Sequence, residues 1–389
     1  MSTTVLLTLG RFPKALSLAR ALHRGGFRVV VADPFRWHLC QVSNCVSKSY
    51  RVTAPNTDRA KYIDDLLRIV DVEAVDLVIP VSEEVVSTVE ISDHLPASTQ
   101  LLSGDKAVVD ALHDKQRFGA RAVALGLPTP ATWLSNDREA QAFTRSNAFI
   151  TKPLNGCSGI GFKWHAAGET PVEVGPDTLL QQAIEGTTIS TLSLIHRGKV
   201  IGTTVYEGLV YAGTVAIAFE RKSAMTAVLE WVNAYCEHLD YTGFIAFDFI
   251  VDSQHTAWGI ECNPRLTSGI HFFDPDSLAN GIGALCHADT AIEASRGSHC
   301  QWGYSVLTEA YRHIFNPARF RAHLSALFRS RDVVWDFRDP LPFLLMTPLS
   351  WEILWPAITT DMSLGEASQR DIAALWSPQH PKSDNQDPS

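Results

Sequence analysis

The sequence predicts an α/β protein that begins with a doubly wound parallel sheet and ends in a mostly helical region. Two observations predict this fold class. Over the first hundred residues, apolar runs of strand length alternate with segments of helical spacing, which is typical of β-α-β units. The chain has 389 residues, of which 46% are hydrophobic and 19% charged, so it can form two or three domains and is not mainly disordered.

The first hundred residues supply the parallel sheet. We expect strands at residues 5–9, 27–32 and 75–81, and helices at residues 14–23 and 62–70. The first helix ends at a Gly-Gly pair. Because consecutive strands are joined by helices, the sheet should be parallel with helices on both faces.

Parallel sheets bind ligands at the carboxyl ends of their strands, and residues 10–14 form the first such loop. The loop lacks the GxGxxG pattern, so it gives little support for a dinucleotide site. Gly10, Arg11 and the following helix N-terminus could hold one small anion. An ordinary strand-to-helix turn is an equally good interpretation.

Later segments follow a different order. Residues 103–105 read as a linker into a helix that reaches about residue 125. Residues 130–285 alternate strands with helices, whereas residues from about 290 onward are mostly helical and rich in Trp and Pro. A polar tail follows residue 378.

Charge and cysteine content limit the functional classes. The chain carries 33 Lys+Arg against 42 Asp+Glu, a net charge of −9, so it has no cationic surplus for nonspecific nucleic-acid binding. Its seven cysteines are scattered without a CxxC pair, which indicates a reduced, cytoplasmic protein. Cys40 and Cys45 lack the further ligands that a tetrahedral metal site needs.

No segment has the pattern of a transmembrane helix. The N-terminal apolar run is too short for a signal peptide. The most apolar late stretch, residues 340–358, contains several prolines and Glu352, which do not suit a helix in lipid. We expect its tryptophan-rich part, residues 335–355, to form a homodimer surface, a cap over the functional site, or both.

A glycine-rich loop lies between two expected strands. The loop reads Asn-Gly-Cys-Ser-Gly-Ile-Gly over residues 155–161, with one strand before it and a second opening at Phe162. Its backbone N–H groups can close over phosphate oxygens, and Lys152 at its base can add a positive charge. It is not a Walker A loop, because no helix follows. A plain glycine-rich hairpin explains this segment alone equally well.

Two acids on neighbouring strands are the sharpest signal. Asp248 is the one charge inside an apolar strand, and Glu261 lies in the next strand. If Val251 pairs with Trp258 across the turn, Asp248 lies directly opposite Glu261. Two facing carboxylates repel each other, so Mg²⁺ bridged to nucleotide phosphates would neutralise them. Two solvated edge charges are the alternative, which the apolar neighbours of both acids disfavour.

The second of these strands continues the pattern. Strand periodicity predicts that Gly259, Glu261 and Asn263 share one face, so the amide oxygen of Asn263 would lie beside the acid. Arg265 follows directly and suits a phosphoryl group or a developing oxyanion.

Four segments in sequential order resemble the ATP-grasp superfamily. More narrowly, they resemble its carboxylate–amine ligase branch, which is related to carbamoyl-phosphate synthase and biotin carboxylase. The segments are Asp114-Lys115 followed by GLPTP, TKPLNGCSGIGF, LLQQAIEGTTIS, and AFDFIVD with WGIECNPRLTSG. The resemblance covers about residues 1–285. It implies an N-terminal α/β domain at 1–105, a lid subdomain with the glycine loop at 106–190, a catalytic core at 191–290 and a C-terminal extension at 291–389.

The resemblance also implies ligand roles. ATP is expected to bind through two lysines at its phosphates, through the glycine loop and through a strand that frames adenine; these positions are Lys115, Lys152, Gly156, Ser158, Gly159, Gly161, Gln181, Gln182, Ala183, Ile184, Glu185 and Thr188. Mg²⁺, or Mn²⁺, is expected on Asp248, Glu261 and Asn263. Arg265 is expected to steady the transferred phosphoryl group.

Three positions depart from the family pattern. Gln181 and Gln182 stand where many relatives carry an acid that accepts from the adenine amino group. Relatives often place a Glu near Thr188 to hold the ribose hydroxyls, and here Glu185 or Thr188 must serve. Asp248 stands where some relatives use the longer Glu.

The implied activity is that of an ATP-dependent ligase. A small-molecule carboxylic acid would become an acyl phosphate, and an amine would then displace phosphate, as in the biosynthesis of amino-acid conjugates. His271 could orient or deprotonate the amine, or it could be a packed core histidine. Residues 82–84 could meet the amine, or they could form a salt bridge or a helix N-terminus. The alternative functions are a nonenzymatic nucleotide sensor and, with less support, an NAD(P)-dependent oxidoreductase.

Overall fold

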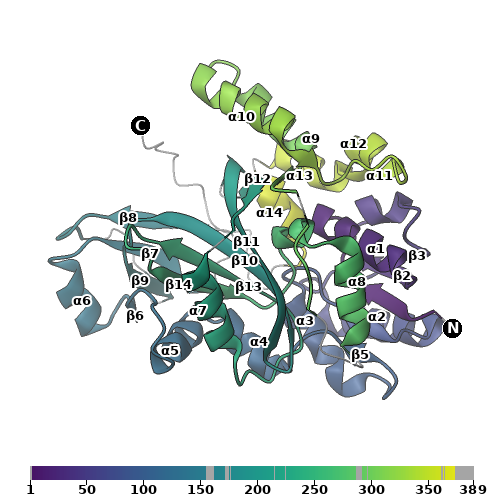
Figure 1. Ribbon diagram of the computed structural model, residues 1–389, viewed down its shortest axis with the longest axis horizontal. Coiled ribbons are helices and arrows are strands. Elements are labelled where there is room, and N and C mark those ends of the chain that lie inside the picture. The colour runs from purple at the N-terminus through teal and green to yellow at the C-terminus, as the bar shows by residue number, and fades with distance from the viewer. Residues whose placement is uncertain are drawn as a thin grey trace.

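The computed structural model describes residues 2–154, 162–170, 175, 177–213, 215–223, 225–285, 291–295, 297–360, 362 and 364–372. Three sheets organise these described residues, and a group of helices follows them in the chain (Figure 1). The expected fold class is confirmed: a parallel sheet at the N-terminus, two further sheets in the middle and mostly helices at the C-terminus.

The N-terminal sheet is parallel throughout. Its strand order is β3-β2-β1-β4-β5, with bounds β1 (Thr4–Leu7), β2 (Arg28–Asp33), β3 (Lys48–Arg51), β4 (Leu77–Ile79) and β5 (Gln100–Leu101). Val5 and Leu7 pack in one core with α1 (Pro13–Arg24), whereas Leu6 packs in another with α2 (Arg59–Glu73). Alternate side chains of β1 therefore face opposite helix layers, which explains why Val5, Leu6 and Leu7 are all apolar.

Short helices connect strands within this sheet and lead from it to the next sheet. They are η1 (Leu39–Val42), α3 (Val85–Thr88) and η2 (Val89–His94), followed by α4 (Lys106–His113) and α5 (Lys115–Ala124). The expectation of a single helix that reaches about residue 125 is wrong, because the helix is interrupted at Asp114. The Asp114 carboxylate accepts hydrogen bonds from the backbone N–H groups of Gln116 and Arg117, so it caps a new helix that starts at Lys115.

The middle sheet is small and antiparallel. Its order is β6-β9-β7-β8, with bounds β6 (Thr132–Leu134), β7 (Phe149–Pro153), β8 (Lys163–His165) and β9 (Thr178–Gln182). Helix α6 (Arg138–Thr144) packs beside β6. The two strands expected around the glycine-rich loop are present as β7 and β8, while the loop itself, residues 155–161, lies outside the described residues.

The large sheet carries the paired acids. Its order is β14-β13-β10-β11-β12-β15-β16, with bounds β10 (Thr187–His196), β11 (Lys199–Ala212), β12 (Val215–Arg221), β13 (Gly243–Val251), β14 (Ala257–Asn263), β15 (His299–Gln301) and β16 (Arg331–Asp332). Helix α7 (Thr226–Cys236) covers one face, where Trp231 and Tyr235 contact Phe247. After β14 the chain forms η3 (Ser268–Phe272) and then α8 (Pro275–Ala284), which packs against α1.

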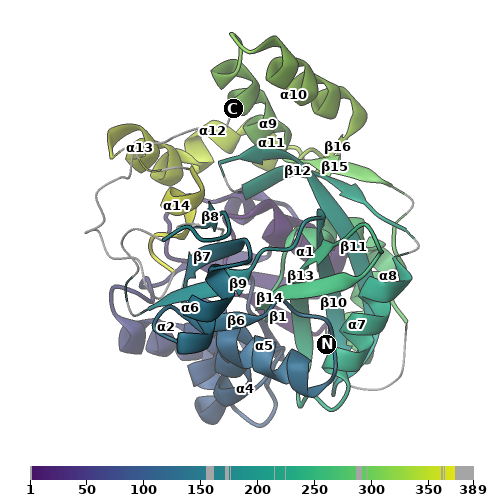
Figure 2. The same ribbon diagram turned by 90° about the vertical axis from the view of Figure 1, so that its left-hand side faces the viewer.

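The C-terminal region lies over one end of the molecule (Figures 1 and 2). It contains α9 (Gly303–Arg312), α10 (Pro317–Arg329), α11 (Leu341–Leu344), α12 (Met346–Leu349), α13 (Trp351–Thr359) and α14 (Leu364–Gln369). It also gives the large sheet its last two strands, β15 and β16. Within the residues described, no helix combines the length and apolar character needed to cross a bilayer.

The pairing of β13 with β14 differs in detail from the expectation. Val251 pairs with Ala257 rather than with Trp258, so the assumed turn register is wrong by one residue. A β-bulge between Asp248 and Phe249 then absorbs one extra residue of β14 and restores the predicted pairing of Asp248 with Glu261.

The bulge also changes which side chains share a face. A Cβ at Gly259 would lie 2.4 Å from the Trp231 ring, on the α7 side of the sheet. The expectation that Gly259 shares a face with Glu261 is therefore wrong, because the strand alternation is interrupted between them.

Candidate active site

One cavity of about 580 Å³ is lined by residues of the N-terminal region, the middle and large sheets and the C-terminal region. Its lining includes four cationic side chains, which are those of Lys14, Lys115, Lys152 and Arg265. The acidic side chains in that lining are Asp248 and Glu261. The described wall is therefore cationic overall although the chain carries a net charge of −9, which favours an anionic ligand.

Lys152 and Gln181 lie together on the middle sheet. The Lys152 ammonium on β7 donates to the Gln181 Oε1 atom at 3.1 Å, and Gln181 in turn donates to the Thr132 hydroxyl at 2.8 Å. Burial lowers the pKa of Lys152 to about 8, although the charges of Glu261 and Asp248 oppose that shift. Lys115, the first residue of α5, is also buried and lines the same cavity.

All of the expected adenine-framing segment, Gln181 to Ile184, lies at the cavity, but only one of the two ribose candidates does. Gln182, Ala183, Ile184 and Thr188 line it, whereas Glu185 is exposed and is absent from its described lining. Of the two residues considered for the ribose, Thr188 is therefore the better placed. The glycine-loop positions Gly156, Ser158, Gly159 and Gly161 lie outside the described residues.

Asp248 is held by hydrogen bonds on both of its oxygens. Oδ1 accepts from the Ser190 hydroxyl at 2.6 Å, and Oδ2 accepts from the Asn263 amide at 3.3 Å. Burial and then the facing charge of Glu261 raise the pKa of Asp248 to about 6. The charge of Glu261 therefore disfavours ionisation of Asp248, a cost that a bound cation would relieve.

The Asn263 amide oxygen has a partner of its own. It accepts from Arg265 Nη2 at 3.1 Å, while its nitrogen faces Asp248. Asp248 and Glu261 fit a divalent cation as they stand. Asn263 would bind a cation through the remaining lone pair of this oxygen.

Arg265 connects the large sheet to the N-terminal domain. Its Nη2 donates to the Glu83 carboxylate at 2.5 Å, and both side chains are largely buried. Burial would raise the pKa of Glu83, but the charges of Arg265, His113 and Lys14, together with the hydrogen bond from Arg265, lower it overall. Of the roles expected for residues 82–84, the salt bridge is present through Glu83, and the helix N-terminus is present because Glu84 directly precedes α3.

Lys14, near the start of α1, lines the cavity, although the sequence did not indicate it as a site residue. Its ammonium donates to the Ser82 hydroxyl and to the Leu266 carbonyl, both at 3.0 Å. Burial, and then the positive charge of Arg265, lower the pKa of Lys14 to about 7.

His271 lies beside the cavity but is poorly suited to act as a base. It is buried in η3, and its Nδ1 shares a hydrogen bond of 2.9 Å with the Ser17 hydroxyl. Burial lowers the pKa of His271 to about 3, so the ring is neutral near pH 7 and binds a proton weakly. This geometry suits the packed or orienting role and disfavours deprotonation of an amine.

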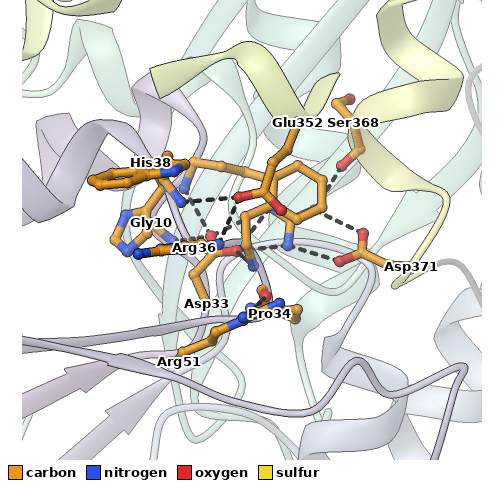
Figure 3. A network of polar contacts seen from close by, with 12 residues as sticks. Gly10, Asp33, Pro34, Arg36, His38, Arg51, Glu352, Ser368 and Asp371 are labelled. Atoms are coloured by element: carbon orange, nitrogen blue, oxygen red, sulfur yellow. Dashed lines mark hydrogen bonds and ion pairs between the residues drawn. The ribbon is translucent and has the colours of Figure 1, made fainter. Parts of the chain in front are cut away.

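The anion site considered at residues 10–14 is filled by the chain itself (Figure 3). The backbone N–H groups of Gly10 and Arg11 both donate to the Asp33 carboxylate, at 2.9 and 3.0 Å. The Arg11 guanidinium binds Asp33 on one side and Asp371 on the other. Arg11 therefore clamps the residues after α14 to the N-terminal sheet.

The C-terminal region supplies one wall of the cavity, and Ile353 and Leu354 of this wall lie in the tryptophan-rich segment 335–355 that was expected to form a homodimer surface, a cap over the site, or both. The wall is uncharged and largely apolar, and it includes Trp302, Tyr304, Val333, Ile353, Leu354 and Leu364. The backbone N–H of Trp302 donates to the Ile217 carbonyl at 2.8 Å, which joins this wall to β12.

Comparisons with known proteins agree with this architecture. Residues 112–269 match the family model described as ATP-grasp domain. A search of curated proteins found no match. The resemblance that the four segments predicted is therefore confirmed for the part of the chain that holds them.

Solved structures share the fold at low identity. N5-carboxyaminoimidazole synthetase from Staphylococcus aureus is 13% identical with a TM-score of 0.60, over 82% of this chain and 88% of that one. The biotin carboxylase domain of 2-oxoglutarate carboxylase from Hydrogenobacter thermophilus is 15% identical with a TM-score of 0.58, over 77% and 71%. L-amino acid ligase from Bacillus licheniformis is 14% identical with a TM-score of 0.52, over 69% and 68%.

Proposed function

With residues 112–269 as an ATP-grasp domain, we propose that this chain is an ATP-dependent ligase that joins a carboxylic acid to an amine. The observation that carries the proposal is a single cavity in which four cations surround two facing carboxylates. Structural neighbours described as a synthetase, a carboxylase domain and an amino acid ligase support this class of chemistry.

The proposed reaction has two steps. A substrate carboxylate oxygen attacks the γ-phosphorus of ATP, the bond from that phosphorus to ADP breaks, and an acyl phosphate forms. The amine nitrogen then attacks the acyl carbon, phosphate leaves with the bonding electrons, and the amine loses a proton. Both steps move negative charge between oxygens, so the protein acts mainly by positioning and by cationic stabilisation.

Lys115 and Lys152 would have a different role from Arg265 in this reaction. Lys115 and Lys152 lie where they can bind ATP phosphates, and burial makes each contact with an anion stronger than it would be in water. Arg265 lies between Glu83 and Asn263, so its guanidinium is fixed in orientation before substrate arrives. A fixed cation stabilises the transferring phosphoryl group without reorganising.

Asp248 and Glu261, with Asn263, would hold Mg²⁺. The described residues form no cluster of three or more His, Cys, Asp or Glu side chains, so phosphate oxygens and water would complete the ligand set. Bound Mg²⁺ supplies charge neutralisation at the phosphates. The H. thermophilus domain was solved with MgADP, which supports this choice of cofactors.

The proposal is tested by measuring nucleotide products from Mg·ATP with a panel of carboxylic acids, with hydroxylamine as a generic amine. Acid-dependent ADP release with a matching hydroxamate is expected. AMP release instead would contradict the acyl-phosphate route. ATP binding without product under any acid and amine tried would favour the sensor hypothesis.

A further inference from the structure

We propose that the acid substrate is an apolar carboxylic acid without a second charged group, and that its tail lies against the C-terminal wall of the cavity. The inference rests on the proposed ligase function and names the substrate class of that site. The inference concerns the acid that is activated. An α-amino acid in that role would carry an ammonium group beside its carboxylate, so it falls outside the proposed class.

The distribution of charge in the cavity carries the first step. The acids in the described lining, Asp248 and Glu261, both lie on the β13–β14 pair. Lys14 and Arg265 also line the cavity; both donate to the Leu266 carbonyl, so two cations lie close together there, where they attract a carboxylate and repel an ammonium. Glu83 is nearby but is paired with Arg265 and is absent from the described lining.

The composition of the C-terminal wall carries the second step. Its described lining contains no Asp, Glu, Lys, Arg or His; apolar side chains, with Trp302, Val333, Ile353 and Leu354 among them, stand beside the uncharged polar residues Ser305, Ser350, Ser368 and Gln369. The facing strand β12 adds Ile217 and Phe219 to the same cavity. A charged tail placed between these surfaces would lose hydration without gaining a partner, whereas an apolar tail would gain from leaving water.

The wall is held in place before any ligand binds. The Trp302 backbone N–H donates to the Ile217 carbonyl, and its indole N–H donates to the Met346 sulfur at 3.4 Å. Arg11 holds the other end of the wall in place: it donates to the Ser368 carbonyl and forms an ion pair with Asp371, and both of these C-terminal residues are labelled in Figure 3. A preformed apolar surface selects a ligand by its shape and lack of charge, with little ordering cost.

The test compares matched pairs of acids by calorimetric binding to the full chain in the presence of Mg·ADP. Hexanoate, octanoate and 3-phenylpropanoate are each paired with the α-amino analogue: norleucine, 2-aminooctanoate and phenylalanine. Two variants of one helix are compared: Leu354→Asp places a charge in the cavity wall, and Trp355→Asp places it on the exposed side of α13. ADP release from Mg·ATP with hydroxylamine is measured for all six acids.

At least one apolar acid should bind about tenfold or more tightly than its α-amino analogue. Leu354→Asp should weaken that binding about tenfold or more, and Trp355→Asp should leave it within about twofold. Tighter binding of the amino analogues, no binding by any acid, or equal effects of the two variants would each overturn the inference.

ADP release separates the two proposals. Release with amino acids but not with apolar acids would overturn the substrate class and leave the ligase proposal standing. Binding of apolar acids with no ADP release for any acid would overturn the ligase proposal while supporting the ligand class.

Discussion

At the scale of single residues, the site is defined by charges that burial has left without full compensation. The pKa of Asp248 is raised to about 6 and the pKa of Lys152 is lowered to about 8, in both cases mainly by burial. Each shift records a free-energy cost of holding the charged form inside the protein. A Mg²⁺-nucleotide would relieve both costs at once, which is why these residues favour a binding site over a purely structural role.

Glu261→Gln tests the metal-binding role of the acid pair. The exchange removes one charge at nearly constant shape, so ADP release should fall by about 100-fold or more. The free energy of unfolding should stay within about 0.5 kcal/mol or rise, because repulsion with Asp248 is removed. Glu230→Gln on the exposed side of α7 is the matched control and should leave both quantities unchanged. Near-normal turnover in Glu261→Gln would contradict the assignment.

Lys14 gives a prediction for pH. Its pKa of about 7 in the free protein, set by burial and then by Arg265, means that the cation is present below pH 7 and lost above it. Binding of an anionic substrate should therefore weaken as pH rises above 7, by up to about tenfold per pH unit. Affinity for the acid chosen from the panel is measured between pH 6 and 9. Lys14→Met should bind weakly at low pH and lose this part of the slope; an unchanged slope would rule Lys14 out.

At the scale of elements, the β-bulge in the β13–β14 pair decides which side chains reach the cavity. Ile260 and Glu261 are adjacent in sequence, yet both line it, while Gly259 lies against Trp231 on the α7 side. Regular alternation cannot place two consecutive side chains in the same cavity. The bulge therefore aims the acid of β14 into the site.

Gly259→Ala tests this close packing. The added Cβ would meet the Trp231 ring at 2.4 Å, so the free energy of unfolding should fall by about 1–3 kcal/mol. The matched control is Gly119→Ala within α5, where a Cβ meets nothing within 4 Å. That control should gain about 0.5–1 kcal/mol, because glycine weakens a helix interior. Urea unfolding measures both, and equal effects of the two exchanges would contradict the packing argument.

At the scale of the whole molecule, the N-terminal sheet and the C-terminal region are joined by buried charges. The Arg11 side chain is 1% exposed and pairs with Asp33 at 2.6 Å and with Asp371 at 2.7 Å. Phe35 lies under the same guanidinium, with its ring centroid 3.3 Å from the Arg11 Cζ atom. This network fixes one end of the cavity wall, so it links global stability to the shape of the site.

Arg11→Met should therefore destabilise the protein strongly. Methionine preserves apolar volume but leaves the Asp33 carboxylate buried without its cation, which should lower the free energy of unfolding by about 3–5 kcal/mol. The control is Arg24→Met, because the Arg24–Asp276 pair is about half exposed and should contribute less than about 1 kcal/mol. Comparable losses in the two variants, measured by urea unfolding, would contradict a special role for the buried network.

The same network predicts acid sensitivity. Burial would raise the pKa of Asp33, but the charges of Arg11 and His38, together with hydrogen bonds from Arg11 and the Phe35 backbone, make the folded-state pKa lower than the ordinary value of 3.8. The stability that this shift contributes is therefore complete above pH 3.8 and is lost as the pH falls through the lower folded-state value. Urea unfolding between pH 2 and pH 6 should show a smaller acid-dependent loss in Asp33→Asn, which is already destabilised at neutral pH, than in the natural chain.

The sequence by itself determined the parts of this protein that depend on neighbouring residues. Apolar runs alternating with segments of helical spacing predicted the parallel sheet, because these patterns follow from local backbone geometry. The pairing of Asp248 with Glu261 was also predicted, although the assumed turn register was wrong by one residue and a β-bulge restored the pairing. Four segments in order predicted the ATP-grasp resemblance, which the family match confirms.

Only the tertiary structure decided what surrounds those acids. Lys14 and Arg265 are 251 residues apart in sequence, and the wall that contains Leu354 comes from a region without any recognised motif. The filling of the first loop by Asp33, and its clamp to Asp371, depend on contacts across the whole chain. Such contacts are set by how the sheets and helices pack together, so no local pattern encodes them.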